Sequence, residues 1–288
     1  MAMTDPILPE SAAKVRLRRQ GDVLRALMTN PTTALGMIII FLLLGMAIFA
    51  PYLMPPNVPD PYQMPRDWGA TRMPPGTPGH PLGTTNQGGD VLYGVVWGSR
   101  SSLQMSLIVV SVTVLIGVVI GSSAGIVGGW IDEALMRLVD IFLSIPELIF
   151  ALAVAAILGP SFTNIILSLC IVFWVKYARI MRAQIILIRQ SDYVQAARVM
   201  GDSRFNIFRR DILPNASTPI AVQATLDMGN IVLVGATLSF IGLSESGIAE
   251  WGVLVSEGQA GIASGRWWAS TFPGLMIFLW ALAFNLVG

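Results

Sequence analysis

The stretch DYVQAARVMGDSRFNIFRRDILPN, residues 192–215, is the one long charged segment that lies between two apolar runs of this chain. Before Gly201, small and apolar residues recur at helical spacing: Tyr193, Ala196, Ala197 and Met200. After the glycine the spacing resumes at Phe205, Phe208 and Ile212. The pattern predicts two short amphipathic helices joined at Gly201, because glycine readily interrupts a helix. A polar hairpin between apolar runs is open to contact by a second protein.

The composition is that of a membrane protein. Hydrophobic residues make up 54% of the 288 positions and charged residues only 12%, with a mean hydropathy of +0.67. An average soluble domain has about 25% charged residues. We therefore predict an integral membrane protein. Its single cysteine, Cys170, cannot form an internal disulfide.

Six apolar runs are long enough to cross a bilayer, which takes about 20 residues of helix. They cover residues 33–50, 101–131, 135–160, 161–188, 219–243 and 267–288. All six should be helices, since backbone exposed to lipid has to satisfy its own hydrogen bonds. The predicted fold class is all-α with six transmembrane helices. We expect Ser217 or Thr218 to cap the fifth helix, with Pro219 in its first turn.

The distribution of Lys and Arg predicts the side that each loop faces. With the N-terminus inside, the inner segments carry 14 of these residues and the outer segments carry 4. The inner ones are Lys14, Arg16, Arg18, Arg19, Arg25, Arg137, Lys176, Arg179, Arg182, Arg189, Arg198, Arg204, Arg209 and Arg210. The positive-inside rule then places both termini and the hairpin in the cytoplasm. A cleaved signal peptide is the competing interpretation of the first run, but its basic cluster ends well before the apolar residues.

These assignments divide the chain into parts. The predicted parts are a cytoplasmic segment 1–32, a first transmembrane helix 33–51, an extracytoplasmic segment 52–100, and a core 101–288 that contains the hairpin loop 191–217 and an outer loop 244–271. Residues 51–81 hold 10 of the 18 prolines and should form neither regular helix nor central strand. We interpret them as a connector, with a partner-binding surface as the alternative. An interfacial helix should follow, with Trp97 at headgroup depth before the second span.

The chain lacks the motifs of a nucleotide-binding protein or a zinc protease. No GxxxxGK[ST] sequence occurs, and neither of the two lysines follows a glycine. His80, the only histidine, has no cysteine near it, so we expect a solvated loop residue and no metal site. We predict no catalytic residue and no cofactor bound by this chain. Energy for any active process should come from a partner that binds ATP and Mg²⁺.

The hairpin is similar to a known family signature. QAARVMG followed by ILPN resembles the cytoplasmic loop of the permease subunits of ABC importers, whose usual form is E-A-A, three residues, Gly, a spacer and I-x-L-P. Gln195 stands where the family usually has Glu. Other segments also look like hallmarks of the second permease of dipeptide, oligopeptide and nickel importers: LGTTNQGGDVLYGVVWGSRSSL, RLVDIFLSIPELIFAL, LSFIGLS, EWG and WWASTFPGL. Asn86 and Gly89 depart from the usual Asp and Arg of the first of these.

The resemblance implies a type I ABC importer permease fold in a prokaryotic inner membrane. It implies an ATPase-docking loop made by Gln195, Ala196, Ala197, Gly201, Asp202, Leu213 and Pro214. In this interpretation alanine permits close approach of the partner, Gly201 makes the turn and Pro214 ends the second helix. The implied partners are a homologous permease, two ATP-binding subunits and an extracytoplasmic solute-binding protein, with no role for nucleic acid. Residues 244–271 would meet the binding protein.

Polar residues inside the spans are candidates for the translocation pathway: Gln223, Asp227, Asn230 and Glu147. The first three share a helical face, and a carboxylate at bilayer depth costs about 2.5–3.5 kcal/mol unless it meets water or a partner. The alternative for Asp227 is a structural hydrogen bond to the neighbouring permease. Asp140 should share a face with Glu147 or pair with Arg137, and Pro146 should mark a kink. Glycines at residues 117, 121 and 125 indicate a close helix contact.

The function predicted from these observations is that of a permease subunit of an ATP-driven importer, most plainly for di- or oligopeptides. Nickel, glutathione and oligosaccharides stay open as substrates, because close relatives carry them. A passive channel or a membrane scaffold without an ATPase is the alternative of a different class. Six helices and a basic hairpin alone are compatible with either.

Overall fold

The computed structural model describes residues 30–288, and this part of the chain is helical without a β-strand. The longer helices are α2 (Pro31–Leu53), α3 (Val91–Val127), α4 (Gly129–Leu143), α5 (Glu147–Leu158), α6 (Phe162–Ile188), α9 (Leu213–Leu238), α10 (Trp251–Ile262) and α11 (Trp268–Val287). The shorter ones are η1 (Trp68–Ala70), α7 (Asp192–Val199), α8 (Arg204–Ile207), η2 (Phe208–Ile212) and η3 (Ser239–Leu243). The all-α prediction is confirmed. Most of the predicted segment 1–32 lies outside the described residues.

Five helices in the described part are individually long and apolar enough to cross a membrane. They are α2, α3, α6, α11 and the helix over residues 204–243 that joins α8, η2, α9 and η3. The third predicted span is not one straight helix, because α4 and α5 meet at an 87° bend. Pro146 lies at this break, and it has no amide hydrogen to continue the hydrogen bonds of α4. The kink predicted there is a complete break, and α4 with α5 makes the sixth candidate span.

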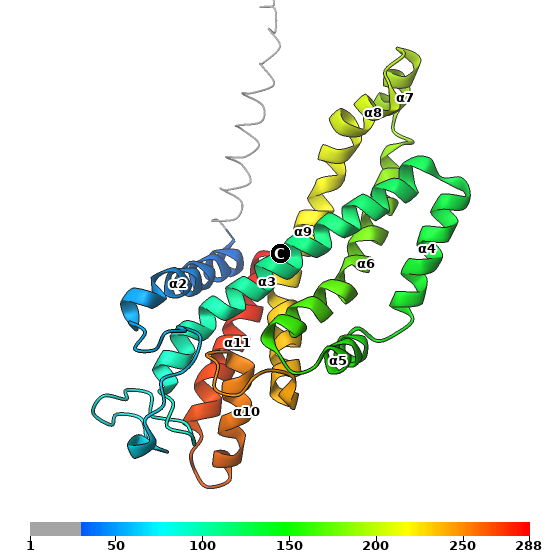
Figure 1. Ribbon diagram of the computed structural model, residues 1–288. Coiled ribbons are helices and arrows are strands. Elements are labelled where there is room, and N and C mark those ends of the chain that lie inside the picture. The colour runs from blue at the N-terminus through cyan, green and yellow to red at the C-terminus, as the bar shows by residue number, and fades with distance from the viewer. Residues whose placement is uncertain (1–29) are drawn as a thin grey trace, which may run out of the picture.

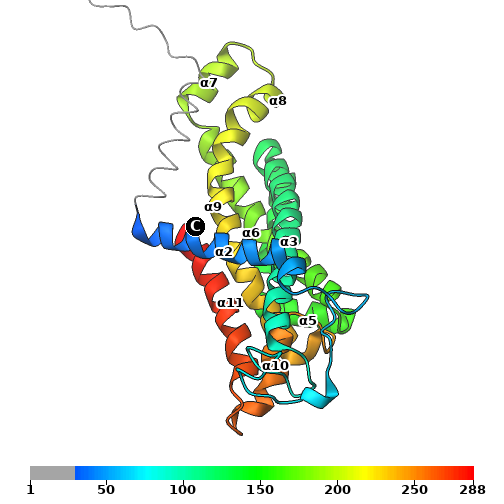
Figure 2. The same cartoon turned by 90° about the vertical axis from the view of Figure 1, so that its left-hand side faces the viewer.

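Helices α3 and α6 lie side by side at the centre of the bundle (Figures 1 and 2). A Cβ added at Gly117 would lie 2.3 Å from Tyr177 Cβ, and one at Gly121 would lie 2.4 Å from the Ala178 carbonyl oxygen. A Cβ at Gly125 would lie 2.9 Å from a side chain of α6. Larger residues do not fit at these separations, so the glycines permit the two backbones to approach. The close contact predicted from their spacing is confirmed.

Two ion pairs join α4 to α6: Arg179–Asp140 and Arg182–Asp132. The sequence suggested Arg137 as the partner of Asp140, and this was wrong. Arg137 instead contacts Glu133 on its own helix at 2.5 Å. Asp140 faces α6, so its partner comes from a neighbouring helix and not from its own.

The helix that contains the second predicted span, α3, begins at Val91, ten residues before Ser101. Asp90 caps α3 by accepting a hydrogen bond from the Tyr93 amide at 2.9 Å. The predicted interfacial helix is therefore the first part of α3. Trp97 is only 2% exposed and donates to the Met54 carbonyl at 3.0 Å, so its ring packs inside the protein. Its position at headgroup depth stays a prediction.

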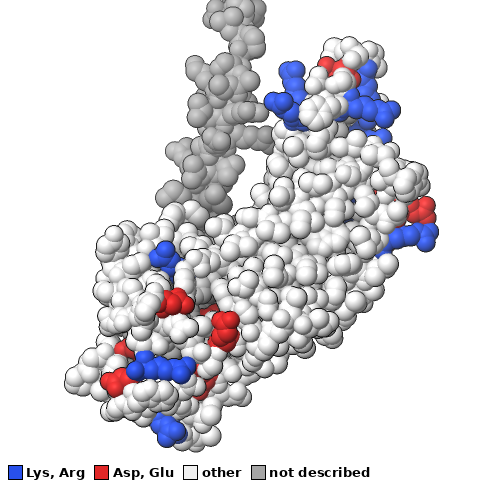
Figure 3. Space-filling view, viewed as in Figure 1, with Lys and Arg blue, Asp and Glu red and all other residues white. Residues whose placement is uncertain are grey.

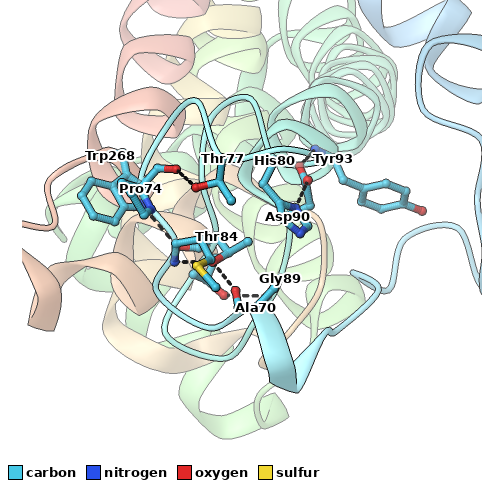
Figure 4. A network of polar contacts seen from close by, with 11 residues as sticks. Ala70, Pro74, Thr77, His80, Thr84, Gly89, Asp90, Tyr93 and Trp268 are labelled. Carbon is cyan, nitrogen blue, oxygen red and sulfur yellow. Dashed lines mark hydrogen bonds and ion pairs between the residues drawn. The ribbon is translucent and has the colours of Figure 1, made fainter.

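The proline-rich segment between α2 and α3 is folded by turns, isolated bridges and the short η1. Figure 4 shows its polar network, in which the Thr84 hydroxyl donates to the Ala70 carbonyl at 2.5 Å. Trp268 of α11 donates to the Thr84 carbonyl at 3.1 Å and joins the segment to the bundle. His80 is not the solvated residue that we predicted, because its Nδ1 lies 2.6 Å from Asp90 Oδ2 and its side chain is 20% exposed. The segment folds back onto the residue that caps α3.

The predicted outer loop 244–271 contains a packed helix, α10. Glu250 caps this helix, because its two carboxyl oxygens accept hydrogen bonds from Gly252 and Val253 at 3.0 and 2.9 Å. Trp251 is fully buried and donates to the Val95 carbonyl of α3 at 3.0 Å. Helix α10 lies beside α11 (Figure 1). Much of this segment is therefore part of the bundle.

Helix α2 crosses the bundle and does not run parallel to its long helices (Figures 1 and 2). One of its sides contacts α3 and α11. Its other side exposes Phe41, Leu42 and Ile48, by 66%, 69% and 62%. Such a face suits lipid or another apolar helix.

Candidate functional site

The charged hairpin, formed by α7, α8 and η2, lies at one end of the molecule, beyond the end of α3 (Figure 1). Lys and Arg gather at this end, whereas the long middle of the visible face shows few charges (Figure 3). The opposite end carries the proline-rich segment and α10 (Figures 1 and 2). The arrangement is that of a membrane-embedded bundle with polar structure at both ends.

Gly201 makes the turn of the hairpin. Its φ is +87°, a conformation that residues with a Cβ rarely adopt. The Gly201 amide donates to the Arg198 carbonyl and the Asp202 amide donates to the Ala197 carbonyl, both at 3.1 Å. These bonds close the end of α7, and Ser203 then caps α8 with its hydroxyl.

One side of the hairpin is buried against α6 and α9. Val194 and Ala197 of α7 are 0% and 7% exposed, and Ile207 and Ile212 beyond the turn are 3% and 4% exposed. These residues form one apolar cluster with Ile185 of α6. The cluster fixes the hairpin to the membrane helices.

The other side of the hairpin exposes large apolar side chains: Val199 by 89%, Met200 by 79% and Phe205 by 68%. The sequence placed Met200 on the packed stripe of α7 together with Tyr193 and Ala197. Only Ala197 of these three is buried, because the stripe that packs runs through Val194. Sequence reasoning missed the exposed set, although an apolar pair next to the turn glycine was a signal for it. Apolar groups exposed at a polar end of a protein indicate a binding surface.

The structure spreads the predicted docking residues over both sides of the hairpin. Gln195, Ala196, Gly201, Asp202 and Pro214 are exposed, Leu213 is half-buried and Ala197 is buried. The prediction that Pro214 ends the second helix was wrong. The chain stays helical through η2 into α9, with Pro214 in the first turn of α9 and Pro219 inside it. Because the helix continues from η2, the missing amide hydrogen of Pro214 leaves a gap in the backbone hydrogen bonds at this point. Ser217 and Thr218 therefore lie within the helix and do not cap it.

Asp227, the ionisable residue of α9, is buried within this chain and is 2% exposed. Gln223, one turn earlier, donates its side-chain amide to Asp227 Oδ1 at 3.0 Å. Asp227 also faces the buried hydroxyl of Tyr177 on α6, but neither its Oδ2 nor that hydroxyl forms a hydrogen bond of ordinary geometry among the described residues. Asp227 thus faces the interior of its own bundle. A role in a translocation pathway stays a prediction.

A second polar group lies where α5, α6 and α9 meet. Glu147 pairs with Lys176 of α6 through Oε2, and its Oε1 accepts a hydrogen bond from Asn230 at 3.3 Å. Lys176 Nζ also lies 4.8 Å from the centre of the Phe173 ring. The side chains of Glu147 and Lys176 are 27% and 29% exposed, so the pair reaches the surface of this chain. The bend between α4 and α5 separates Glu147 from Asp140, which were expected to share a helical face.

The sequence counted Lys176 on the inner side, although it also fell within the span predicted over residues 161–188. In the structure it lies near the middle of α6. The signal was present, since Lys176 is the only charged residue from position 162 to position 178. A lone lysine in an apolar span indicates a carboxylate partner, because an unpaired charge at bilayer depth is costly.

The structure is that of a multi-pass membrane protein whose hairpin exposes apolar side chains at one polar end and whose helices are joined by ionisable pairs. Comparison with known families gives its class. Residues 117–288 match the family described as binding-protein-dependent transport system inner membrane component, and residues 20–75 match the N-terminal TM domain of oligopeptide transport permease C. The chain belongs to this family of inner-membrane permeases.

Several curated relatives are similar over nearly the whole chain. The probable D,D-dipeptide transport system permease protein DdpC of Escherichia coli K12 is 39% identical over 98% of this chain and 94% of that protein. The dipeptide transport system permease protein DppC of Bacillus subtilis is 33% identical over 97% of this chain and 86% of that protein. DppC of Haemophilus influenzae is 34% identical over 90% of this chain and 88% of that protein.

Membership in the family has direct consequences. The chain is a multi-pass inner-membrane permease subunit and not an enzyme. Its transport system includes an ATPase and a solute-binding protein. The recognition of an ABC importer permease from the hairpin and the other hallmark segments is confirmed.

Proposed function

We propose that this chain is one of two homologous permease subunits in an importer of di- or oligopeptides driven by ATP hydrolysis. The observation that carries the proposal is the hairpin: one side is buried against the spans, and the other exposes Val199, Met200 and Phe205. The relatives named as dipeptide permeases support peptides as the substrate class.

The hairpin is the docking element for the ATPase. Two ATP-binding subunits hold ATP and Mg²⁺, and each docks on the hairpin of one permease. Both termini of this chain and the hairpin then face the cytoplasm, while α10 and the proline-rich segment face the solute-binding protein. Gln195, Ala196 and Asp202 lie on the exposed side and meet the ATPase directly. Gly201 acts by fixing the turn between α7 and α8.

Transport proceeds by alternating access. Closure of the ATPases moves the hairpins, and the bundle passes from an inward-open to an outward-open state. The ATPase has to bind the two states with different free energies, because a partner with equal affinity for both would leave the equilibrium between them unchanged. The pair Glu147–Lys176 reaches the surface of the chain, and it is the part of the polar cluster best placed to meet substrate or the second permease.

Co-purification in mild detergent tests the docking role. Ala196→Arg places a long charged side chain on the exposed side of α7, and Ala260→Arg makes the same change at an exposed position of α10, at the opposite end. We expect A196R to lose the ATPase subunits and A260R to retain them, with both variants inserted in the membrane. Full recovery of the ATPase with A196R, or a homomeric ring without any ATPase, would contradict the proposal.

The substrate class needs a separate experiment. The complete importer, reconstituted with its binding protein, should hydrolyse ATP faster and accumulate label when dipeptides are supplied. Stimulation by nickel, glutathione or an oligosaccharide, with none by peptides, would refute the peptide assignment and leave ATPase docking intact.

A further inference from the structure

Three ionisable side chains lie close together where α5 and α9 pack on α6: Glu147, Lys176 and Asp227. Glu147 is the only charged residue of α5, and Asp227 is the only one of α9. Helix α11 and the part of α3 beyond Arg100 carry no charge, and the two arginines of α6 already pair with α4. One lysine therefore faces two carboxylates, which gives the ionised cluster a net charge of −1.

The two carboxylates are unequally satisfied. Glu147 pairs with Lys176 through Oε2, and its Oε1 accepts a hydrogen bond from Asn230 at 3.3 Å. Asp227 Oδ1 accepts a hydrogen bond from its own helix at 3.0 Å. Its Oδ2 and the facing hydroxyl of Tyr177 form no hydrogen bond of ordinary geometry among the described residues. A buried oxygen without a donor is costly, so Asp227 has an acceptor free for a cation that comes within reach.

Lys176 can serve either carboxylate. Its ammonium group lies at the end of a flexible stem of four carbons and has three donors. Its charge acts on Asp227 as well as on Glu147, and the next residue, Tyr177, faces Asp227. A move from Glu147 to Asp227 would exchange one carboxylate partner for another. The move requires a second cation at Glu147, because that carboxylate would otherwise be left unpaired.

Glu147 is the carboxylate that a ligand can reach. Its side chain is 27% exposed and that of Lys176 is 29% exposed, whereas Asp227 is only 2% exposed. Glu147 and Lys176 belong to helices of candidate membrane spans, where an ionisable residue faces water or another protein and not lipid. The cluster thus has an open acid at Glu147 and a buried acid at Asp227, which share one lysine.

We propose that Glu147 binds the ammonium group of a peptide in transit while Lys176 moves across to Asp227. The peptide supplies the positive charge that the cluster lacks, and the loaded site is neutral. An unmodified peptide carries this group at its N-terminus near neutral pH. The inference rests on the proposed function, because it takes peptides as the substrate class. A basic residue of the second permease is the competing occupant of Glu147, and the experiment separates the two.

Direct binding tests this assignment on the assembled permeases and ATPases in nanodiscs, without the binding protein, so that only sites of the membrane complex are measured. The two labelled ligands are alanyl-alanine and propionyl-alanine, which is the same molecule without its amino group. A hydrogen bond to a charged group contributes a factor of about 10 to 100 in affinity, so the wild type should prefer alanyl-alanine by this ratio. In Glu147→Gln the preference should disappear.

Three further variants separate substrate binding from a structural role. Lys176→Met removes the cation that competes for Glu147, so it should bind alanyl-alanine more tightly than the wild type, whereas a structural pair would be damaged by either change. Lys176→Met with Glu147→Gln leaves neither charge of the pair unpaired and should show no preference. Asp140→Asn with Arg179→Gln removes the neighbouring exposed pair between α4 and α6 and should keep the wild-type preference.

Three outcomes would overturn the proposal. One is a preference for alanyl-alanine that survives Glu147→Gln, and another is weaker binding of this ligand to Lys176→Met than to the wild type. The third is loss of the second permease from the Glu147 variants in native mass spectra, which would place the pair at the subunit interface. Peptide uptake by the wild-type importer is measured separately, so an error in the substrate class is distinguished from an error in this site.

Discussion

Replacement of Phe205 by alanine should weaken ATPase binding without destabilising the permease. Phe205 is 68% exposed and belongs to none of the buried apolar clusters of the described chain. Complete burial of a phenylalanine side chain contributes about 1.5–3 kcal/mol, so covering the exposed part in a partner contributes about 1–2 kcal/mol. This corresponds to a loss of affinity of about 5- to 30-fold in Phe205→Ala.

Ile207 provides the matched control, because it lies in the same helical turn but faces inward. It is 3% exposed and packs in the cluster that fixes the hairpin to α6. Ile207→Ala should lower the unfolding free energy of the permease by about 2–5 kcal/mol through the cavity that it leaves. The assay measures ATPase affinity for the permease in nanodiscs alongside thermal unfolding of the same sample. Wild-type affinity of F205A, or equal destabilisation by both variants, would refute the reasoning.

Three further predictions concern the bundle. Gly121→Ala should lower the thermal midpoint of the permease, because the added Cβ would lie 2.4 Å from a backbone oxygen of α6. Gly45→Ala is the control and should leave the midpoint unchanged, because a Cβ there would have no atom within 4 Å. Equal midpoints for the two variants would argue against close packing of α3 and α6. Removing one partner of a fully buried ion pair costs roughly 3–5 kcal/mol of stability. The pair of Lys176 with Glu147 is partly exposed, so Lys176→Met should cost less than this. If the loss comes from the carboxylate left unpaired, adding Glu147→Gln should restore the stability. Burial raises the pKa of the Glu250 carboxyl above its ordinary value, so between these two pKa values the folded state binds a proton that the unfolded state releases. The thermal midpoint of the permease should therefore fall as the pH rises through the raised pKa. If Glu250→Gln leaves the dependence of the midpoint on pH unchanged, this reasoning is refuted.

The number of spans could be predicted from the sequence because length and apolarity are local properties. The contact between α3 and α6 was also predictable, since the glycines repeat at helical spacing in one segment. The position of the bend at Pro146 could be predicted from the sequence, but its angle of 87° could not. Proline interrupts the backbone hydrogen bonds of a helix without fixing the direction of the next helix.

Contacts between distant segments could not be predicted in this way. Asp140 has a basic residue at helical spacing, Arg137, yet it pairs with Arg179 on another helix. The packed side of α7 was ambiguous, since Val194 and Tyr193 both start stripes at helical spacing and only the position of α6 decides between them. At the candidate site, the turn at Gly201 was therefore predictable, but the partition of the hairpin into inner and outer sides was not.

The position of the two prolines in α9 has a mechanical consequence. Neither Pro214 nor Pro219 can donate a backbone hydrogen bond, and both lie in the helix that joins the hairpin to the level of Asp227. A helix bends more readily where its backbone hydrogen bonds are missing, so α9 should bend most easily in this stretch. If the ATPase docks on the hairpin as proposed, the hairpin could then tilt while the part of α9 around Asp227 keeps its place. A helix with a complete set of backbone hydrogen bonds would pass the same tilt on to the rest of the bundle.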